Sequence, residues 1–215
     1  MDTSDRHRLL QSRLKTFNPN RFPVSRWLAL YSAAVATADH DIMKLALNRG
    51  GQHLRRDDFY EIVLQSYLFL GFPRMLIAAQ TLAEVHPPPA DLPSDTRAIS
   101  VREAADWFER GLRLYNQVYD DKADVLRHKV EGFAPEVFRW MVIEGYGKVL
   151  SRSGPAIVDR ELSIVSFLMM DNREQQLISH LMGAVNVGAS PEVIGLVVED
   201  IGHAAEGYEL SLIHI

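Results

Sequence analysis

Apolar residues recur at helical spacing between Glu161 and Gly188, and this periodicity constrains the fold more than any other feature of the sequence. The residues that share the spacing are Leu162, Val165, Ser166 and Met169, then Leu177, Leu181, Ala184 and Val185. Residues three and four apart lie on one face of an α-helix. The stretch is therefore expected to form two helices with buried stripes, joined at Asp171-Asn172.

The rest of the chain shows helix signals as well. Ser100 and Glu103 have the spacing of a capping box, and Gly71-Phe72-Pro73 is expected to end one helix before another runs on at an angle to Val85. Asp39 or Asp41 can cap a helix that ends at Gly50. No stretch alternates apolar and polar residues between hairpin turns. The sequence therefore predicts an all-α fold.

An internal repeat is also expected. The order apolar helix, capped helix ending in Asn-x-Gly, short turn and apolar helix occurs around residues 27–71 and again around residues 161–207. Two such units in one chain would pack about a pseudo-twofold axis, each burying the apolar face of the other. The expected organisation is a polar N-terminal segment (1–24), a first helical unit (25–86), a proline-rich linker (87–99) and a second helical unit (100–215).

Composition excludes several classes of function. The chain has no cysteine, so disulfides, thiolate nucleophiles and zinc–thiolate sites are impossible. A net charge of −5 argues against nucleic acid or an anionic membrane as the main partner. No apolar run reaches the ~18 residues that span a bilayer, and the N-terminus does not resemble a signal peptide. We expect a cytoplasmic protein that spans no membrane.

One acid and one base stand out in the 161–188 stretch. His180 lies on the buried stripe, where a polar ring is tolerated only if it is hydrogen-bonded. Glu161, at the start of the preceding helix, has the position to supply that partner. A satisfied core histidine, with Glu161 favoured near a helix N-terminus by the helix dipole alone, is the simpler alternative. The first unit has Ile42 where the second has His180, so only the second can hold this pair.

The segment from Glu144 to Ser190 resembles the core of the γ-carboxymuconolactone decarboxylase family, part of the AhpD-like helical superfamily. The motifs that carry the resemblance are Ser151-Arg152-x-Gly154 and His180-x3-Ala184-x3-Gly188, although the adjacent Tyr146-Gly147 changes one spacing. The resemblance implies an AhpD-like bundle and a small organic acid or lactone as substrate. It implies no metal and no organic cofactor.

The thiol-dependent branch of that superfamily places a glutamate, two cysteines and a histidine at positions that correspond here to Glu161, Arg173, Gln176 and His180. The acid and the base match, but both cysteines are absent. Because a disulfide cycle needs two thiols, peroxidase or disulfide-reductase activity is chemically excluded.

The resemblance implies a cofactor-independent lyase in which His180 and Glu161 perform acid–base chemistry on a small acid or lactone. Arg152 or Arg173 would bind the substrate carboxylate through a bidentate contact. Tyr146 is a further substrate-binding candidate, although its helical spacing is more simply that of a core residue. Two acidic clusters, at residues 120–128 and 199–203, are interpreted as solvated faces and not as metal sites.

The alternative is a non-catalytic helical protein that keeps the fold for binding or scaffolding. In either case we expect a homo-oligomer, because residues 193–198 and the tail 210–215 are too apolar for one small bundle to hide. Relatives form rings from single-unit chains, so a trimer of two-unit chains, or a dimer, is expected.

Overall fold

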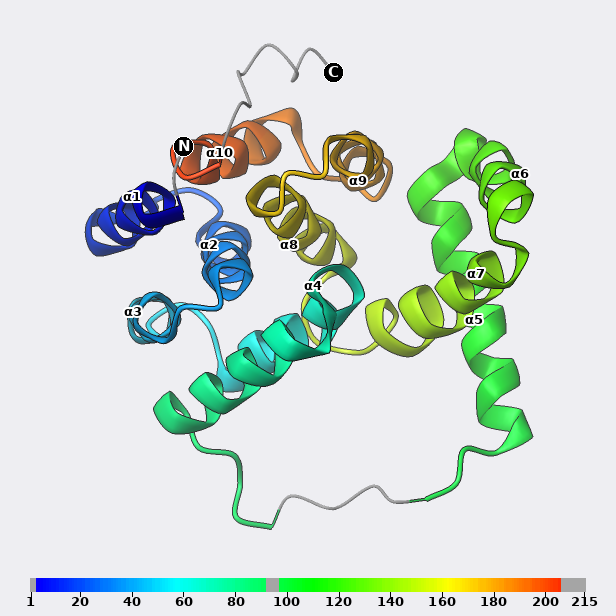
Figure 1. The fold of residues 1–215 in the computed structure, drawn as a ribbon, viewed down its shortest axis with the longest axis horizontal. Helices are drawn as coiled ribbons and strands as arrows, with labels where there is room; N and C mark the ends of the chain where they lie inside the picture. Colours follow the sequence, from blue (N-terminus) through cyan, green and yellow to red (C-terminus); the bar gives the residue numbers. More distant parts are fainter. Residues whose placement is uncertain (1–2, 92–96, 206–215) are drawn as a thin grey trace. The chain divides into compact units, whose positions relative to one another are not determined.

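The computed structural model describes residues 3–91 and 97–205 and confirms an all-α fold, with no strand in those two ranges (Figure 1). The helices are α1 (Thr3–Thr16), α2 (Pro23–Thr37), α3 (His40–Gly50), α4 (Arg56–Val85), α5 (Val101–Tyr119), the 3-10 turn η1 (Asp120–Lys122), α6 (Ala123–Phe133), α7 (Pro135–Trp140), the π-helix η2 (Met141–Leu150), α8 (Ile157–Met170), α9 (Glu174–Asn186) and α10 (Pro191–Gly202).

The chain forms two compact units, but they differ from the expected sequential division. Residues 1–87 and 154–215 make up unit 1, and residues 88–153 make up unit 2. The physical reason is that α8, α9 and α10 bury their apolar faces in the same core as α1 to α4. The chain leaves unit 1 at the start of the proline-rich linker. Residues 100–153 and 154–215, which were expected to form one unit, belong to different units.

Helices α2 and α8 form the centre of unit 1 and lie side by side, with α3 and α4 against α2 and with α9 and α10 against α8 (Figure 1). Every residue of α8 from Arg160 to Met170 is buried, and so is every residue of α2 from Arg26 to Val35. Such helices, covered on all sides, are typical of the middle of a bundle. The candidate acid, Glu161, is therefore fixed on the most enclosed helix of the unit.

The N-terminal segment is part of this core, which corrects the expectation of a separate polar segment over residues 1–24. Leu10 and Leu14 of α1 are fully buried, and Phe17 is nearly so. These two leucines lie one turn apart, so α1 has a single narrow apolar stripe on an otherwise polar helix. The average polarity of residues 1–24 conceals such a stripe.

Helix α4 bends where the sequence predicts it. Gly71 has φ 76° and ψ 165°, values that no α-helix contains, and Pro73 follows. By length and composition α4 is the one described helix that could cross a membrane. The bend divides it into two halves of about 15 residues, each roughly 22 Å long, while a hydrocarbon core is about 30 Å thick.

Helix caps also agree with the sequence. The Asp39 carboxylate accepts hydrogen bonds from the backbone N–H groups of Asp41 and Ile42, and Ser100 with Glu103 forms a complete capping box. The predicted pseudo-twofold relation between repeats is not established. Gly188 has φ 103°, whereas its counterpart Gly50 has no positive φ, so the matched triplets end their helices differently.

Unit 2 has a small core of its own. Gly111 of α5 and Gly147 of η2 lie where the two backbones cross, and a Cβ on either would collide with a carbonyl of the facing helix. The aromatic rings that fill the space beside this crossing are Tyr115, Tyr119, Phe138 and Tyr146.

Candidate functional site

Glu161 and His180 are in direct contact. Nδ1 of His180 lies 2.8 Å from Oε2 of Glu161, a hydrogen-bonding distance, across the α8–α9 interface. Glu161 is in the second turn of α8 and His180 in the middle of α9, and the tight turn at residues 171–173 makes the two helices neighbours. The juxtaposition of acid and base expected from the sequence is present in the structure.

The pair is enclosed by aromatic rings. Phe69 of α4 meets the imidazole of His180 edge to face, with ring centroids 5.5 Å apart, and stacks on Phe167 of α8 at 6.1 Å. Glu161 is fully buried and His180 is 6% exposed. Nothing in the sequence singles out Phe69, because it is one of several aromatic residues in an apolar helix and its contact is with a residue more than 100 positions away.

One oxygen of this carboxyl group lacks a hydrogen-bond partner. Among the described residues, Oε1 of Glu161 is buried and accepts no hydrogen bond, although Oε2 is bonded to His180. A buried carboxylate oxygen without a donor is costly, by roughly 1–3 kcal/mol or more. A protonated carboxyl group, a water molecule or a ligand donor at Oε1 would remove that cost.

The residue before Glu161 forms a second buried charge pair. Arg160 is fully buried and its Nη2 donates to Oε2 of Glu61 on α4 at 3.0 Å, while its Nε donates to the Pro155 carbonyl at 3.3 Å. Gln65 donates to the Arg160 carbonyl oxygen at 3.1 Å. These contacts bind the first turn of α8 to α4 and so fix the position of Glu161. Sequence reasoning missed Arg160 and Glu61, which are 99 positions apart.

Of the expected substrate-binding residues, Arg173 belongs to the same unit as His180. Arg173 is 62% exposed and its Nε donates to Asp171 at 2.8 Å. It precedes His180 by seven residues, or about 10 Å along α9. Arg152 and Tyr146 belong to unit 2. The Tyr146 hydroxyl donates to the Tyr119 hydroxyl at 2.8 Å inside the aromatic core, which favours the core interpretation of this residue.

The described part of the chain contains no group of three or more acidic, histidine or cysteine side chains arranged to hold a metal ion. In the 199–203 cluster, the Asp200 carboxylate is held by Arg13 and, in a two-bond contact at 2.7 and 2.8 Å, by Arg26. In the 120–128 cluster, His128 contacts the backbone carbonyl of Asp124. Asp200 and His128 therefore each have another partner.

No model of a known protein family matches this chain, and neither does any curated protein. The relation to the carboxymuconolactone decarboxylase family consequently remains an expectation from the sequence motifs.

Proposed function

We propose that unit 1 is a carboxymuconolactone decarboxylase-like enzyme in which His180, held by Glu161, moves a proton to or from a small organic acid or lactone. The observation that supports it is the 2.8 Å contact between the two side chains inside an apolar enclosure. A carboxylate bonded to Nδ1 fixes the orientation of an imidazole and stabilises its protonated form. Proton transfer to substrate would then run through Nε2.

The chemistry follows from these groups. In an α,β-unsaturated lactone that carries its carboxylate on the saturated γ carbon, the C–C bond to the carboxylate breaks and carbon dioxide leaves. The electron pair of that bond passes through the double bond onto the carbonyl oxygen and forms a dienolate. His180 then delivers the Nε2 proton to carbon, and a solvent proton restores the imidazolium. The Glu161 side chain keeps the ring in position through its contact with Nδ1. The step needs no redox partner, which agrees with a chain that has no thiol.

The surroundings of the pair also support the proposal. Phe69 and Phe167 keep the local dielectric low, which strengthens the interaction of Glu161 with a charged ring. The Oε1 atom of Glu161, which has no partner among the described residues, is positioned to accept a hydrogen bond from a substrate hydroxyl or from a water molecule.

The alternative is a non-catalytic helical protein used for binding or scaffolding, and one observation favours it. His180 is only 6% exposed, and a ring so enclosed, with a carboxyl partner, also has the surroundings of a structural core histidine. The two functions differ in whether a small molecule can reach the imidazole.

The test is an assay of decarboxylation on a panel of carboxylated five-membered lactones. Carbon dioxide release is the quantity measured. His180→Gln keeps the size of the side chain but cannot act as the acid, so turnover should fall at least about 100-fold. Glu161→Gln should lower it by a smaller factor, because the ring keeps its place but loses the stabilising charge.

The matched control is His128→Gln, which removes an exposed imidazole from α6 of unit 2 and should leave turnover unchanged. The proposal is refuted if His180→Gln is as active as wild type on a substrate that wild type converts. It is also refuted if no lactone in the panel is converted at all, and the non-catalytic function then remains.

A further inference from the structure

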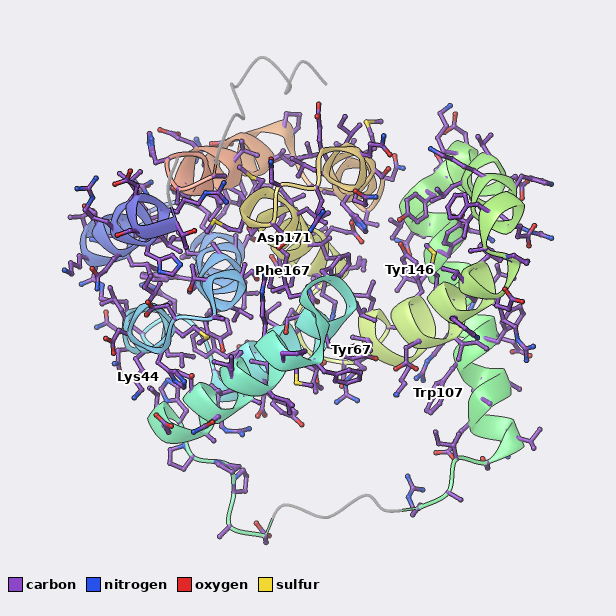
Figure 2. The ribbon with its side chains drawn as sticks, viewed as in Figure 1. Lys44, Tyr67, Trp107, Tyr146, Phe167 and Asp171 are labelled. Atoms are coloured by element: carbon purple, nitrogen blue, oxygen red, sulfur yellow. The ribbon has the colours of Figure 1, made fainter. Side chains whose placement is uncertain are left out.

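A polar pocket of about 240 Å³ lies at the opposite end of α8 from Glu161. Four helices line it: the start of α1, the end of α2, the second half of α4 and the end of α8. The lining residues are Thr3, Arg6, His7, Ala36, Thr37, Arg74, Met170 and Asp171. Phe167 and Asp171, labelled in Figure 2, mark this end of α8. Met170 follows Glu161 by nine residues, about 14 Å along the helix, so the pocket is separate from the His180 site.

Positive charge predominates in the lining. Arg6 and Arg74 face the pocket from two different helices, and Asp171 is the one acidic residue among the lining residues that the structure describes. The Asp171 carboxylate is already held by Arg74 at 2.9 Å and by Arg173 at 2.8 Å. Burial alone would raise the pKa of Asp171, but the hydrogen bonds and charges of Arg173 and Arg74 outweigh it and lower the pKa. The carboxylate is thus ionised and its charge is offset.

Arg6 and Arg74 carry donor groups that suit an oxyanion. Arg6 donates from Nη1 to the Met170 carbonyl oxygen at 3.3 Å, and Arg74 donates from Nη1 to Asp171. A guanidinium has five N–H donors in a rigid fork that fits a carboxylate or phosphate. His7 lies beside them and is itself 3.4 Å from the Asp39 carboxylate. Both guanidinium groups line the pocket.

The volume sets the size of the ligand. A cavity of about 150 Å³ holds one benzene molecule, so 240 Å³ has room for roughly ten non-hydrogen atoms. That is enough for a small sugar phosphate fragment or a dicarboxylic acid. The hydroxyl groups of Thr3 and Thr37 add polar atoms to the wall.

We propose that this pocket binds a small organic or inorganic oxyanion, gripped between Arg6 and Arg74 where α1, α2, α4 and α8 meet. The site is independent of the proposed decarboxylase activity, because it shares no residue with the His180–Glu161 pair. A ligand there would join the N-terminal helix to the end of α8, and so stabilise unit 1.

The experiment is isothermal titration calorimetry of the full chain with inorganic phosphate and, separately, with malonate. We expect one saturable site for at least one of them, and the tighter of the two identifies a phosphate or a carboxylate ligand. Arg6→Gln and Arg74→Gln should each weaken binding at least tenfold. Arg8→Gln, which removes an exposed cation of the same helix, should change it less than twofold.

A further variant covers the case in which loss of Arg74 disturbs folding through Asp171. Ala36→Leu fills the pocket and leaves both arginines in place, so it should abolish binding without changing the net charge. The proposal is overturned if neither anion saturates a site below about 10 mM. It is equally overturned if Arg8→Gln weakens binding as much as Arg6→Gln, because net charge alone would then explain the effect, or if Ala36→Leu binds like wild type.

Discussion

Breaking the buried ion pair between Glu61 and Arg160 should destabilise unit 1 strongly. The two charged groups are 3.0 Å apart and their side chains are 9% and 1% exposed. At an effective dielectric constant of about 20, their attraction is about 5 kcal/mol. Glu61→Gln would leave the Arg160 guanidinium buried without its counter-charge, for which a loss of about 3–5 kcal/mol is expected. That is a large fraction of the ~5–15 kcal/mol that holds a typical domain folded.

The two units require a probe that reports on unit 1 alone. Trp27 is 1% exposed in the core of unit 1, whereas Trp107 and Trp140 belong to unit 2. In a Trp107→Phe/Trp140→Phe background, the fluorescence of Trp27 during urea unfolding therefore follows unit 1. The free energy of unfolding from this signal should fall by about 3–5 kcal/mol in Glu61→Gln.

A double-mutant cycle separates the charge effect from packing. Glu61→Leu/Arg160→Met removes both charges together, so it should cost less than the sum of Glu61→Leu and Arg160→Met by at least about 1.5 kcal/mol. Additivity of the two single changes within about 0.5 kcal/mol would refute the reasoning, since it would show that the pair does not interact.

Two further changes test the surroundings of α8. Gly154→Ala should lower the free energy of unfolding by about 1–3 kcal/mol in the same assay, because Gly154 has φ 120° and an added Cβ would lie 3.0 Å from Cγ of Glu61. The control is Gly195→Ala on α10, where an added Cβ meets nothing within 4 Å. Equal losses in the two variants would contradict the expected backbone strain at Gly154. Asp159 has its pKa raised by burial, against the hydrogen bond from Ser25. The folded state therefore holds this proton more tightly, and the stability it gives is lost as pH rises through the raised pKa. Wild type should therefore lose stability relative to Asp159→Asn as pH rises above the ordinary aspartate pKa of about 3.9, and urea midpoints whose difference is independent of pH would contradict this.

Local signals made most of the helices predictable from the sequence. Asp39, Ser100 and the Gly71-Phe72-Pro73 break act within one turn of the residues that they affect, so their consequences can be read without the tertiary structure. The Glu161–His180 contact was predictable for a related reason. The two residues lie on consecutive helices joined by a tight turn. They are only 19 positions apart in the sequence, and the turn makes them neighbours in space.

The features that sequence reasoning missed depend on distant parts of the chain. Arg160 would be expected at the surface, and its burial depends on partners such as Glu61, which lies on another helix. The division into units follows from α8 packing on α2, which no local pattern encodes. The oxyanion pocket is lined by residues from four helices. Its two arginines, Arg6 and Arg74, are 68 positions apart in the sequence.

The most direct measurement of the central claim is the rate at which diethyl pyrocarbonate modifies His180 in the folded chain, followed residue by residue by peptide mass spectrometry. If the imidazole performs proton chemistry on small molecules, it must be reachable and nucleophilic, and it should react within about tenfold of the rate of exposed His128. A His180 that stays unmodified until the chain unfolds would contradict the account and show a sealed structural histidine.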